Sequence, residues 1–217
     1  MDSINAYTRN LRYDFQKSGL EETDVPTNPF QLFGLWYAEA VESKLREPNA
    51  MTLMTSGKSG KPTGRIVLLK EFHPHHFLFF TNYESKKGED LLFNSNAALL
   101  FYWQSMERQV RIEGRVQKTS SEISNVYFSE RPRESQIGAW ASAQSKVLKS
   151  RVELEEKVKK LDEEYKGKTI PRPPHWGGFD LEADYYEFWQ GRPGRLHDRF
   201  SFTKKSDGSW ARERLSP

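Results

Sequence analysis

The segment TGRIVLLKEFHPHHFLFFTN, residues 63–82, contains two β-rich runs, TGRIVLLK and HFLFFTN, on either side of a turn. Three similar runs surround it: AMTLMTS at 50–56, AALLFYWQ at 97–104 and RQVRIEGRV at 108–116. Short apolar and β-branched runs bounded by turn residues are typical of strands. Their order along the chain predicts an antiparallel sheet that curls toward a barrel.

Helices are predicted around this sheet. Asn28 can cap a helix that begins at Pro29, because proline needs no backbone donor in the first turn, and this helix ends near Lys44. A short helix is predicted within ESKKGEDLLFN, residues 84–94. Further helices are predicted over Ser121–Glu130, Glu134–Ala143 and Ser150–Tyr165.

Strand patterns return near the C-terminus in DYYEFWQG at 184–191, RLHDRFSF at 195–202 and SWARERL at 209–215. Three strands alone make a poor core, so we expect them to rejoin the first sheet. The sequence therefore predicts a mainly β protein of six to eight antiparallel strands with peripheral helices. One domain is predicted over residues 28–217, preceded by a polar, partly flexible arm over residues 1–27.

Composition narrows the function classes. Among 217 residues there are 33 Lys plus Arg against 30 Asp plus Glu, so the near-balanced charge gives no indication of a nucleic-acid partner. No residue is cysteine, which excludes thiolate catalysis and disulfides and fits a reducing compartment. The longest apolar run, residues 97–103, is far shorter than the roughly 18 residues of a membrane span. A cytoplasmic protein with no membrane partner is predicted.

The segment Arg195-Leu-His-Asp-Arg199 is the first candidate site. If it is a strand, alternate side chains share a face, and Arg195, His197 and Arg199 form one cationic surface. Arginine offers a fixed fork of donors and histidine changes protonation near neutral pH, which suits an anion or a ring oxygen. An exposed edge strand kept soluble by charge remains the alternative.

The second candidate is the segment from Tyr127 to Ser135. Pro132 disfavours helical geometry at Arg131, so one helix should end there and the next can begin. Arg131, the Ser135 hydroxyl and the free N–H groups of a helix start are donors that a phosphate monoester uses. An ordinary helix–loop–helix with surface arginines is the alternative.

Weaker signals come from two pairs of cations. Arg65 and Lys70 differ in strand parity and should not share a face unless a bulge or a strand end intervenes. Lys86 and Lys87 precede a short helix and could meet a second phosphate, although such a pair is common on surface turns.

The histidines of the HPHH turn, residues 73–76, are a conceivable metal site. No acidic or thiol ligand accompanies them, so no metal is predicted.

Six blocks together resemble the pyridoxamine 5′-phosphate oxidase family, and the resemblance extends from about Arg12 to the terminal ERLSP. They are RIVLLK at 65–70, FFTNYESKKG at 79–88, ERQVRIEG at 107–114, YFSERPRESQIGAWAS at 127–142, WGGF at 176–179 and EFWQGRPGRLHDR at 187–199.

This resemblance implies an FMN-binding split β-barrel of the antiparallel Greek-key type, working as a homodimer with FMN at the subunit interface. It also implies the reaction: oxygen oxidises pyridoxamine 5′-phosphate or pyridoxine 5′-phosphate to pyridoxal 5′-phosphate, with release of hydrogen peroxide. The alternatives are a non-oxidase split-barrel flavoprotein, a carrier that binds B6 phosphates, and a flavin reductase that uses a nicotinamide.

By matching positions, the resemblance also implies site residues. Those implied to contact FMN are Arg65, Ile66, Val67, Leu68, Leu69, Lys70, Phe80, Thr81, Lys86, Lys87, Gln109, Gln144, Ser145, Trp189 and Arg199. Those implied to bind substrate are Arg12, Lys70, Tyr127, Arg131, Ser135, Arg195 and His197. Arg195 and His197 are implied to be the catalytic pair over the pyridine ring, and we expect them to orient the substrate more than they transfer protons.

Two positions depart from the family pattern. Lys86 stands where the family generally has arginine, which keeps the charge but loses the bidentate geometry for phosphate. Phe15 stands where the N-terminal lid of the family carries a tyrosine, which removes its hydroxyl group.

Overall fold

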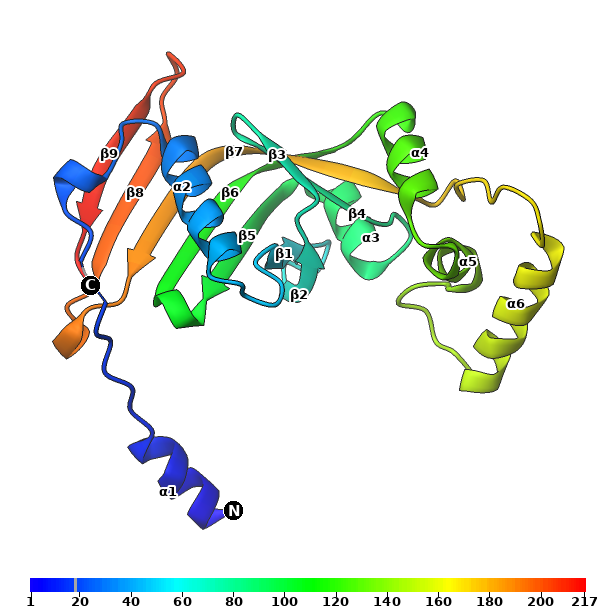
Figure 1. Cartoon of the computed structure of the whole chain (residues 1–217), viewed down its shortest axis with the longest axis horizontal. Helices are drawn as coiled ribbons and strands as arrows, with labels where there is room; N and C mark the ends of the chain where they lie inside the picture. Colours follow the sequence, from blue (N-terminus) through cyan, green and yellow to red (C-terminus); the bar gives the residue numbers. More distant parts are fainter. Residues whose placement is uncertain (18) are drawn as a thin grey trace. The chain divides into compact units, whose positions relative to one another are not determined.

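The computed structural model describes residues 1–17 and 19–217 (Figure 1). Its strands are β1 (Ala50–Ser56), β2 (Pro62–Leu68), β3 (Glu71–His73), β4 (His76–Asn82), β5 (Asn96–Trp103), β6 (Arg108–Lys118), β7 (Trp176–Gln190), β8 (Asp198–Lys204) and β9 (Trp210–Leu215). They form one sheet in the order β2-β1-β5-β6-β7-β4-β3, with β8 paired to β7 and β9 paired to β8. The β1–β2, β1–β5, β3–β4, β4–β7, β7–β8 and β8–β9 pairs are antiparallel.

The helices are α1 (Asp2–Asn10), α2 (Pro29–Glu42), α3 (Lys86–Phe93), α4 (Ser121–Glu130), α5 (Arg133–Ala141) and α6 (Arg151–Glu164). Short 3-10 turns are η1 (Glu22–Asp24), η2 (Gln104–Met106) and η3 (Pro193–Arg195). In the part of the chain that the structure describes, no helix is long and apolar enough to cross a membrane.

The chain divides into two compact units. Unit 1 comprises residues 1–48, 101–111 and 185–217, and unit 2 comprises residues 49–100 and 112–184. Strands β5, β6 and β7 contribute residues to both units.

The core of unit 1 is aromatic. Asn28 caps α2 by accepting a hydrogen bond from the Phe30 N–H at 3.0 Å, as the sequence predicts. The buried face of α2 presents Phe33 and Trp36 to the strands, where Phe33 lies 5.3 Å from Phe101 and Trp36 meets Phe188 edge-on at 5.3 Å between ring centroids. Each buried aromatic of this kind contributes on the order of 2–3 kcal/mol of hydrophobic stabilisation.

The core of unit 2 follows the alternation of its strands. Met51, Leu53 and Thr55 of β1 are buried while their neighbours are partly exposed. Strands β6 and β7 approach closely at Gly114, where an added Cβ would lie 2.0 Å from the carbonyl oxygen of Glu182. Glycine is therefore required for these two strands to pack. Helices α5 and α6 lie side by side (Figure 1).

Most predicted elements are confirmed. The helix predicted over Ser121–Glu130 is α4 with the same bounds, and the C-terminal strands do rejoin the first sheet. The predicted strand number was wrong, because the described residues form nine strands. The added one is β3, which has only three residues and pairs with β4 across the HPHH turn. The boundary between an arm and a domain at residue 27 stays a prediction.

The predicted strand over RLHDRFSF was wrong at its start. Pro193 begins the turn η3, and both Gly194 and Arg195 have a positive φ, 65° and 63°. A strand cannot hold that backbone geometry, so β8 begins only at Asp198. Arg195 and His197 are consequently placed by a turn and not by strand alternation.

Candidate functional site

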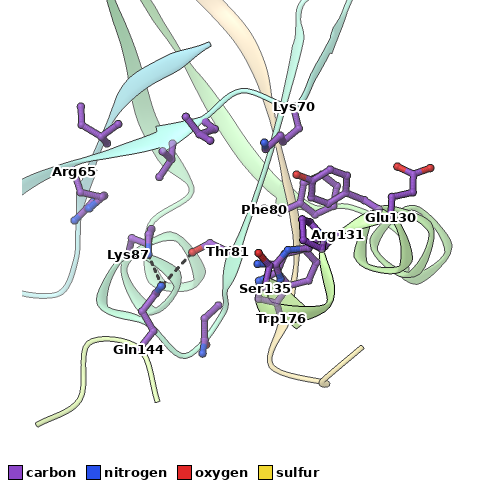
Figure 2. A pocket seen from close by; sticks show the side chains of 16 residues that line it. Arg65, Lys70, Phe80, Thr81, Lys87, Glu130, Arg131, Ser135, Gln144 and Trp176 are labelled. Carbon is purple, nitrogen blue, oxygen red and sulfur yellow. Dashed lines mark hydrogen bonds between the residues drawn. The ribbon is translucent and has the colours of Figure 1, made fainter. Parts of the chain in front are cut away.

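A cavity of about 570 Å³ lies in unit 2 (Figure 2). Residues 65–68 of the lining belong to β2, and Lys70 follows that strand. Phe80 lies on β4, Lys87 on α3 and Arg131 at the junction of α4 and α5. Twelve of the residues predicted from sequence line it: Arg65, Ile66, Val67, Leu68, Lys70, Phe80, Thr81, Lys87, Tyr127, Arg131, Ser135 and Gln144. Lys70 reaches the same space as Arg65 because β2 ends at Leu68, so strand parity does not apply to it.

One end of the cavity holds Arg65 and Lys87. The Arg65 guanidinium donates to the Leu53 carbonyl at 3.1 Å and to the hydroxyls of Thr55 and Thr63 at 2.8 and 2.6 Å. The Lys87 ammonium donates to the Gln144 side-chain oxygen at 2.6 Å, as the dashed line in Figure 2 shows. All of these acceptors are neutral oxygens.

The protonation of Lys87 reflects this environment. Burial, together with repulsion from Arg65, lowers the pKa of Lys87 from 10.5 to about 8. Burial also lowers the pKa of Arg65, although Asp90 offsets part of that effect. Two partly buried cations with neutral acceptors make this end of the cavity attractive to an anion.

The other end holds Arg131 above an aromatic stack. Phe80 stacks on Tyr127 at 4.0 Å and on Trp176 at 5.6 Å between ring centroids, and the Arg131 guanidinium carbon lies 4.5 Å from the centre of the Trp176 ring. Figure 2 shows Arg131, Ser135 and Trp176 close together, across the cavity from Arg65.

Arg131 has an unused hydrogen-bond donor. Its Nη1 atom is buried and meets no hydrogen-bond acceptor within residues 1–17 and 19–217. Burial lowers the pKa of Arg131, while Tyr127 acts in the opposite direction. A buried unpaired guanidinium nitrogen is costly, and such groups in native proteins usually have a reason. An anion in the cavity would satisfy it.

A second group of predicted residues lies in unit 1. The His197 and Trp189 rings lie 4.6 Å apart, and His197 Nδ1 accepts a hydrogen bond from the Arg192 backbone N–H at 3.1 Å. Burial and the charge of Arg195 lower the pKa of His197, and Asp198 offsets part of this. The imidazole is therefore neutral near pH 7, with Nδ1 accepting and the proton on Nε2.

Arg199 is held by a buried carboxylate. Glu187 Oε1 accepts from Arg199 Nε at 2.9 Å and from Arg199 Nη2 at 2.7 Å, while Glu187 Oε2 accepts from Arg111 at 2.6 Å. Burial raises the pKa of Glu187, but hydrogen bonds from Arg111 and Arg199 outweigh burial and bring it below its ordinary value. Glu187 thus fixes the direction of the Arg199 guanidinium.

The remaining predicted residues do not line the unit 2 cavity. Leu69 is buried in the core, Ser145 is exposed with a φ of 69°, and Lys86 pairs with Asp90. The others belong to unit 1: Arg12, Gln109, Trp189, Arg195, His197 and Arg199.

Four residues that line the cavity were not predicted from the sequence: Asn82, Glu130, Pro132 and Trp176. Trp176 matters most, because it forms the floor beneath Arg131. The available signal was that Trp176 begins WGGF, one of the blocks that carry the family resemblance. Glu187 was also missed, although antiparallel pairing of EFWQG with the RLHDR segment places a carboxylate near Arg199.

Two family models match this chain. The model described as pyridoxamine 5′-phosphate oxidase matches residues 37–164, and the model described as pyridoxine 5′-phosphate oxidase C-terminal dimerisation region matches residues 176–217. The chain belongs to the pyridoxamine 5′-phosphate oxidase family. The resemblance noted in the sequence is thereby confirmed.

Curated relatives agree with this family. A pyridoxine/pyridoxamine 5′-phosphate oxidase from Microcystis aeruginosa is 52% identical over 208 residues, covering 96% of this chain and 97% of the relative. Another of the same name, from Burkholderia lata, is 54% identical over 210 residues, covering 96% and 98%. The matches thus extend over nearly the full length of each protein.

Solved structures confirm the split-barrel fold class of this oxidase family. PhzG from Burkholderia lata, in complex with tetrahydrophenazine-1-carboxylic acid, superposes with a TM-score of 0.87 at 27% identity, covering 94% of this chain and 100% of that chain. A pyridoxamine 5′-phosphate oxidase-related, FMN-binding protein from Nostoc punctiforme superposes with a TM-score of 0.70 at 15% identity, covering 89% and 100%. The second likeness concerns the fold alone.

The position of Lys86 leads to a prediction about cofactor affinity. Its ammonium is bound by the buried Asp90 carboxylate and does not line the cavity, unlike Lys87. We therefore expect Lys86→Gln to change the dissociation constant for FMN by less than about threefold, because the Lys86 side chain lies outside the cavity and is engaged by Asp90. The same change should lower the melting temperature by about 2–4 °C, since Asp90 loses its cationic partner.

Fluorescence titration with FMN and thermal unfolding measure the two effects separately. Lys166→Gln, at an exposed lysine of another surface pair, is the control for simple loss of charge. A tenfold weaker affinity in Lys86→Gln would contradict this interpretation and support the direct FMN contact that the resemblance implies.

Proposed function

We propose that this chain is an FMN-dependent oxidase that converts pyridoxamine 5′-phosphate and pyridoxine 5′-phosphate into pyridoxal 5′-phosphate and releases hydrogen peroxide. The observation that carries the proposal is the buried Nη1 of Arg131 at the α4–α5 junction, beside Ser135, which has no hydrogen-bond partner among the described residues. A phosphate monoester is an acceptor that suits this guanidinium and hydroxyl. Relatives of that name at 52% and 54% identity support the same substrates.

FMN is the cofactor in this proposal, and the residues present fit it. Its phosphate would bind Arg65 and Lys87, whose pKa values are both lowered in its absence. Residues 66–68 of β2 line the cavity, and β2 is the last strand at its end of the sheet order, so its outer edge can offer backbone donors and acceptors. When bound, FMN would supply the redox chemistry, as acceptor of a hydride from the 4′ carbon of the substrate and donor of electrons to oxygen; with the amine substrate, water would then replace the nitrogen at that carbon and ammonia would leave.

The substrate phosphate would be held at the opposite end of the cavity. Arg131 and Lys70 supply positive charge, while Ser135 and Tyr127 supply hydroxyl donors. Two separate cationic ends suit two separate phosphates, one from FMN and one from the substrate. Trp176 and Phe80 would provide a flat apolar surface beneath Arg131 at this end.

Arg195 and His197 orient the pyridine ring in this proposal. The neutral imidazole donates a hydrogen bond from Nε2 because the Arg192 N–H already occupies Nδ1. Trp189 and Arg199, with Glu187 behind it, would contact FMN. The enzyme is a cytoplasmic homodimer with FMN at the subunit interface; the match of residues 176–217 to a dimerisation region supports the dimer.

An anaerobic titration tests the reaction. We expect that adding pyridoxamine 5′-phosphate to the FMN-loaded protein without oxygen bleaches the visible flavin band. This anaerobic step should form one pyridoxal 5′-phosphate per flavin, and air should then restore the band. Pyridoxamine without its phosphate is the matched control and should bleach the band far more slowly, because Arg131 and Ser135 have nothing to bind.

Other outcomes would point to the alternatives. Flavin that stays oxidised while pyridoxamine 5′-phosphate binds would favour a non-oxidase flavoprotein or a carrier of B6 phosphates. Bleaching by a reduced nicotinamide alone would favour a flavin reductase. The likeness to PhzG raises one more candidate, a reduced phenazine carboxylate, whose anionic group could also meet Arg131. We expect tetrahydrophenazine-1-carboxylic acid to leave the flavin band unchanged over the same time.

A further inference from the structure

Glu107 is a buried carboxylate in unit 1 with no role in the reaction derived above. It is 2% exposed and ends the turn η2 with a φ of 55°, a conformation that few non-glycine residues adopt. Its carbonyl oxygen accepts hydrogen bonds from the Gly191 N–H at 2.8 Å and the Gln190 side-chain amide at 3.2 Å. The backbone at Glu107 is therefore fixed against the end of β7.

The side chain of Glu107 binds the N-terminal segment 13–17, hereafter the arm segment. Its Oε2 accepts from the backbone N–H groups of Gln16 at 3.0 Å and Lys17 at 2.9 Å, and its Oε1 accepts from the Tyr13 hydroxyl at 3.2 Å. Two successive backbone N–H groups directed at one carboxylate are a favourable arrangement for an anion. The hydrogen bond to Glu107 raises the pKa of Tyr13, so its phenol stays a donor at neutral pH.

These contacts make the carboxylate and the arm segment depend on each other. A buried carboxylate is unfavourable unless hydrogen-bond donors compensate for lost water, and the three donors above all come from the arm segment. If the arm segment left, water would solvate Glu107 again. Glu107 and the arm segment therefore stabilise each other in this position.

The arm segment places Phe15 against two residues of the candidate site. The Phe15 ring meets His197 edge-on at 5.2 Å and Trp189 edge-on at 5.4 Å between centroids. Gly191 provides the room, because a Cβ at that position would lie 2.6 Å from Phe15 Cδ1. Phe15 thus covers the His197–Trp189 pair.

We propose that Glu107 is a positioning residue that fastens the arm segment and so seats Phe15 as an apolar cover on His197 and Trp189. The cover excludes water from the imidazole that orients the substrate. The effect on the substrate rests on the proposed function, whereas the fastening itself does not. Glu107 acts through Phe15 and does not touch the substrate.

Hydrogen exchange of the FMN-loaded full-length protein tests the fastening directly. We expect the amides of Gln16 and Lys17 to exchange about tenfold faster in Glu107→Gln, because a charged acceptor becomes a neutral amide with its own N–H groups. The Leu20 amide donates to Asp198 at 2.9 Å and should keep its protection. Glu156→Gln, at an exposed residue of α6, is the matched control and should leave all three amides unchanged.

Kinetics test the route through Phe15. We expect Glu107→Gln and Phe15→Ala each to raise the KM for pyridoxamine 5′-phosphate about fivefold with a smaller change in kcat. The double variant should be no worse than Phe15→Ala alone, because both changes remove one cover. Gly191→Ala keeps the Glu107 carboxylate and would place a methyl group 2.6 Å from Phe15 Cδ1 and 3.1 Å from Glu107 Cβ; because the Phe15 contact is the tighter one, the ring must move, and KM should rise in the same way.

Each result decides the proposal. Unchanged exchange at Gln16 and Lys17 in Glu107→Gln, or KM effects that multiply in the double variant, would overturn it. If Glu107→Gln does not fold, Gly191→Ala decides alone: an unchanged KM rejects the cover. If the protein does not oxidise pyridoxamine 5′-phosphate at all, the exchange result still settles the fastening, and only the proposed function fails.

Discussion

Replacing Arg131 with leucine should lower kcat/KM for pyridoxamine 5′-phosphate by about 100-fold, since a guanidinium–phosphate contact is a strong charge-assisted interaction of up to about 3 kcal/mol. The melting temperature should stay nearly unchanged. Arg131 Nη1 has no acceptor among the described residues, so replacing Arg131 removes the free-energy cost of burying a donor that makes no hydrogen bond. This gain offsets the lost contact between the guanidinium and the Trp176 ring.

Steady-state kinetics and thermal unfolding of the same preparations measure both quantities. Arg133→Leu is the matched control, two residues away. Arg133 donates to the Asp162 carboxylate at 2.8 Å and to the Asp162 carbonyl at 3.0 Å, so its loss should affect stability and leave kcat/KM unchanged. Arg131→Lys should recover part of the activity, because it restores charge without the planar fork. A loss of activity in Arg131→Leu that merely follows a loss of stability would contradict the proposal.

The contrast between Arg131 and Arg133 shows how much of the α4–α5 junction could be predicted from the sequence. Pro132 cannot continue a helix from Arg131, so the break between α4 and α5 and the donors around it followed from local backbone rules. The sequence did not indicate which of the two arginines, Arg131 or Arg133, lines the cavity. That choice depends on Trp176, which lies 45 positions further along the chain and packs beneath Arg131 only in the folded sheet.

The prediction from local sequence pattern was wrong at residues 195–197, which lie in and just after a turn and not in a strand. Arg195 and His197 fit a strand by composition, but Pro193 and Gly194 are turn residues, and their combination gave the better signal. The error did not remove the residues from the site. The turn, and not strand alternation, places Arg195 and His197. It also lets the Arg192 N–H donate to His197 Nδ1, which leaves the proton of the neutral ring on Nε2.

The difference between Lys86 and Lys87 was partly available from the sequence. Lys86 and Asp90 are four residues apart, the spacing that joins opposite charges on one helix face, and the structure pairs them. Lys87 has leucine at that spacing, although it lies three residues before the same Asp90, a spacing that also joins opposite charges, so the sequence favours the Lys86 pair only in part. Its burial and its proximity to Arg65 required the fold, and these give Lys87 a pKa that the sequence could not indicate.

Replacing Lys87 with glutamine should weaken FMN binding by about 30- to 100-fold at pH 7.5, because the FMN phosphate loses a charge-assisted donor in a partly buried site. Removing Lys87 also relieves repulsion on Arg65, so the fold itself should tolerate the change. Fluorescence titration measures the affinity. Lys86→Gln is the neighbouring control, expected to stay within about threefold, because Lys86 pairs with Asp90 and does not line the cavity.

The pH dependence of FMN affinity follows from the same lysine. Without FMN the pKa of Lys87 is about 8, so the ammonium loses its proton progressively above that pH. A phosphate dianion favours the ammonium and raises this pKa in the complex, which means that binding takes up a proton above pH 8. Affinity should therefore be flat between pH 7 and about 8 and then fall by up to about tenfold per pH unit as pH rises further.

Stability without FMN should change in the opposite direction. The unfolded chain, with the ordinary pKa of 10.5, binds more protons at Lys87 than the folded chain does between pH 8 and 10.5, so this lysine makes the fold more stable as pH rises through that window. Lys87→Gln should remove both trends together. Affinity that declines equally in wild type and Lys87→Gln would assign the titration to another group and separate Lys87 from the phosphate of FMN.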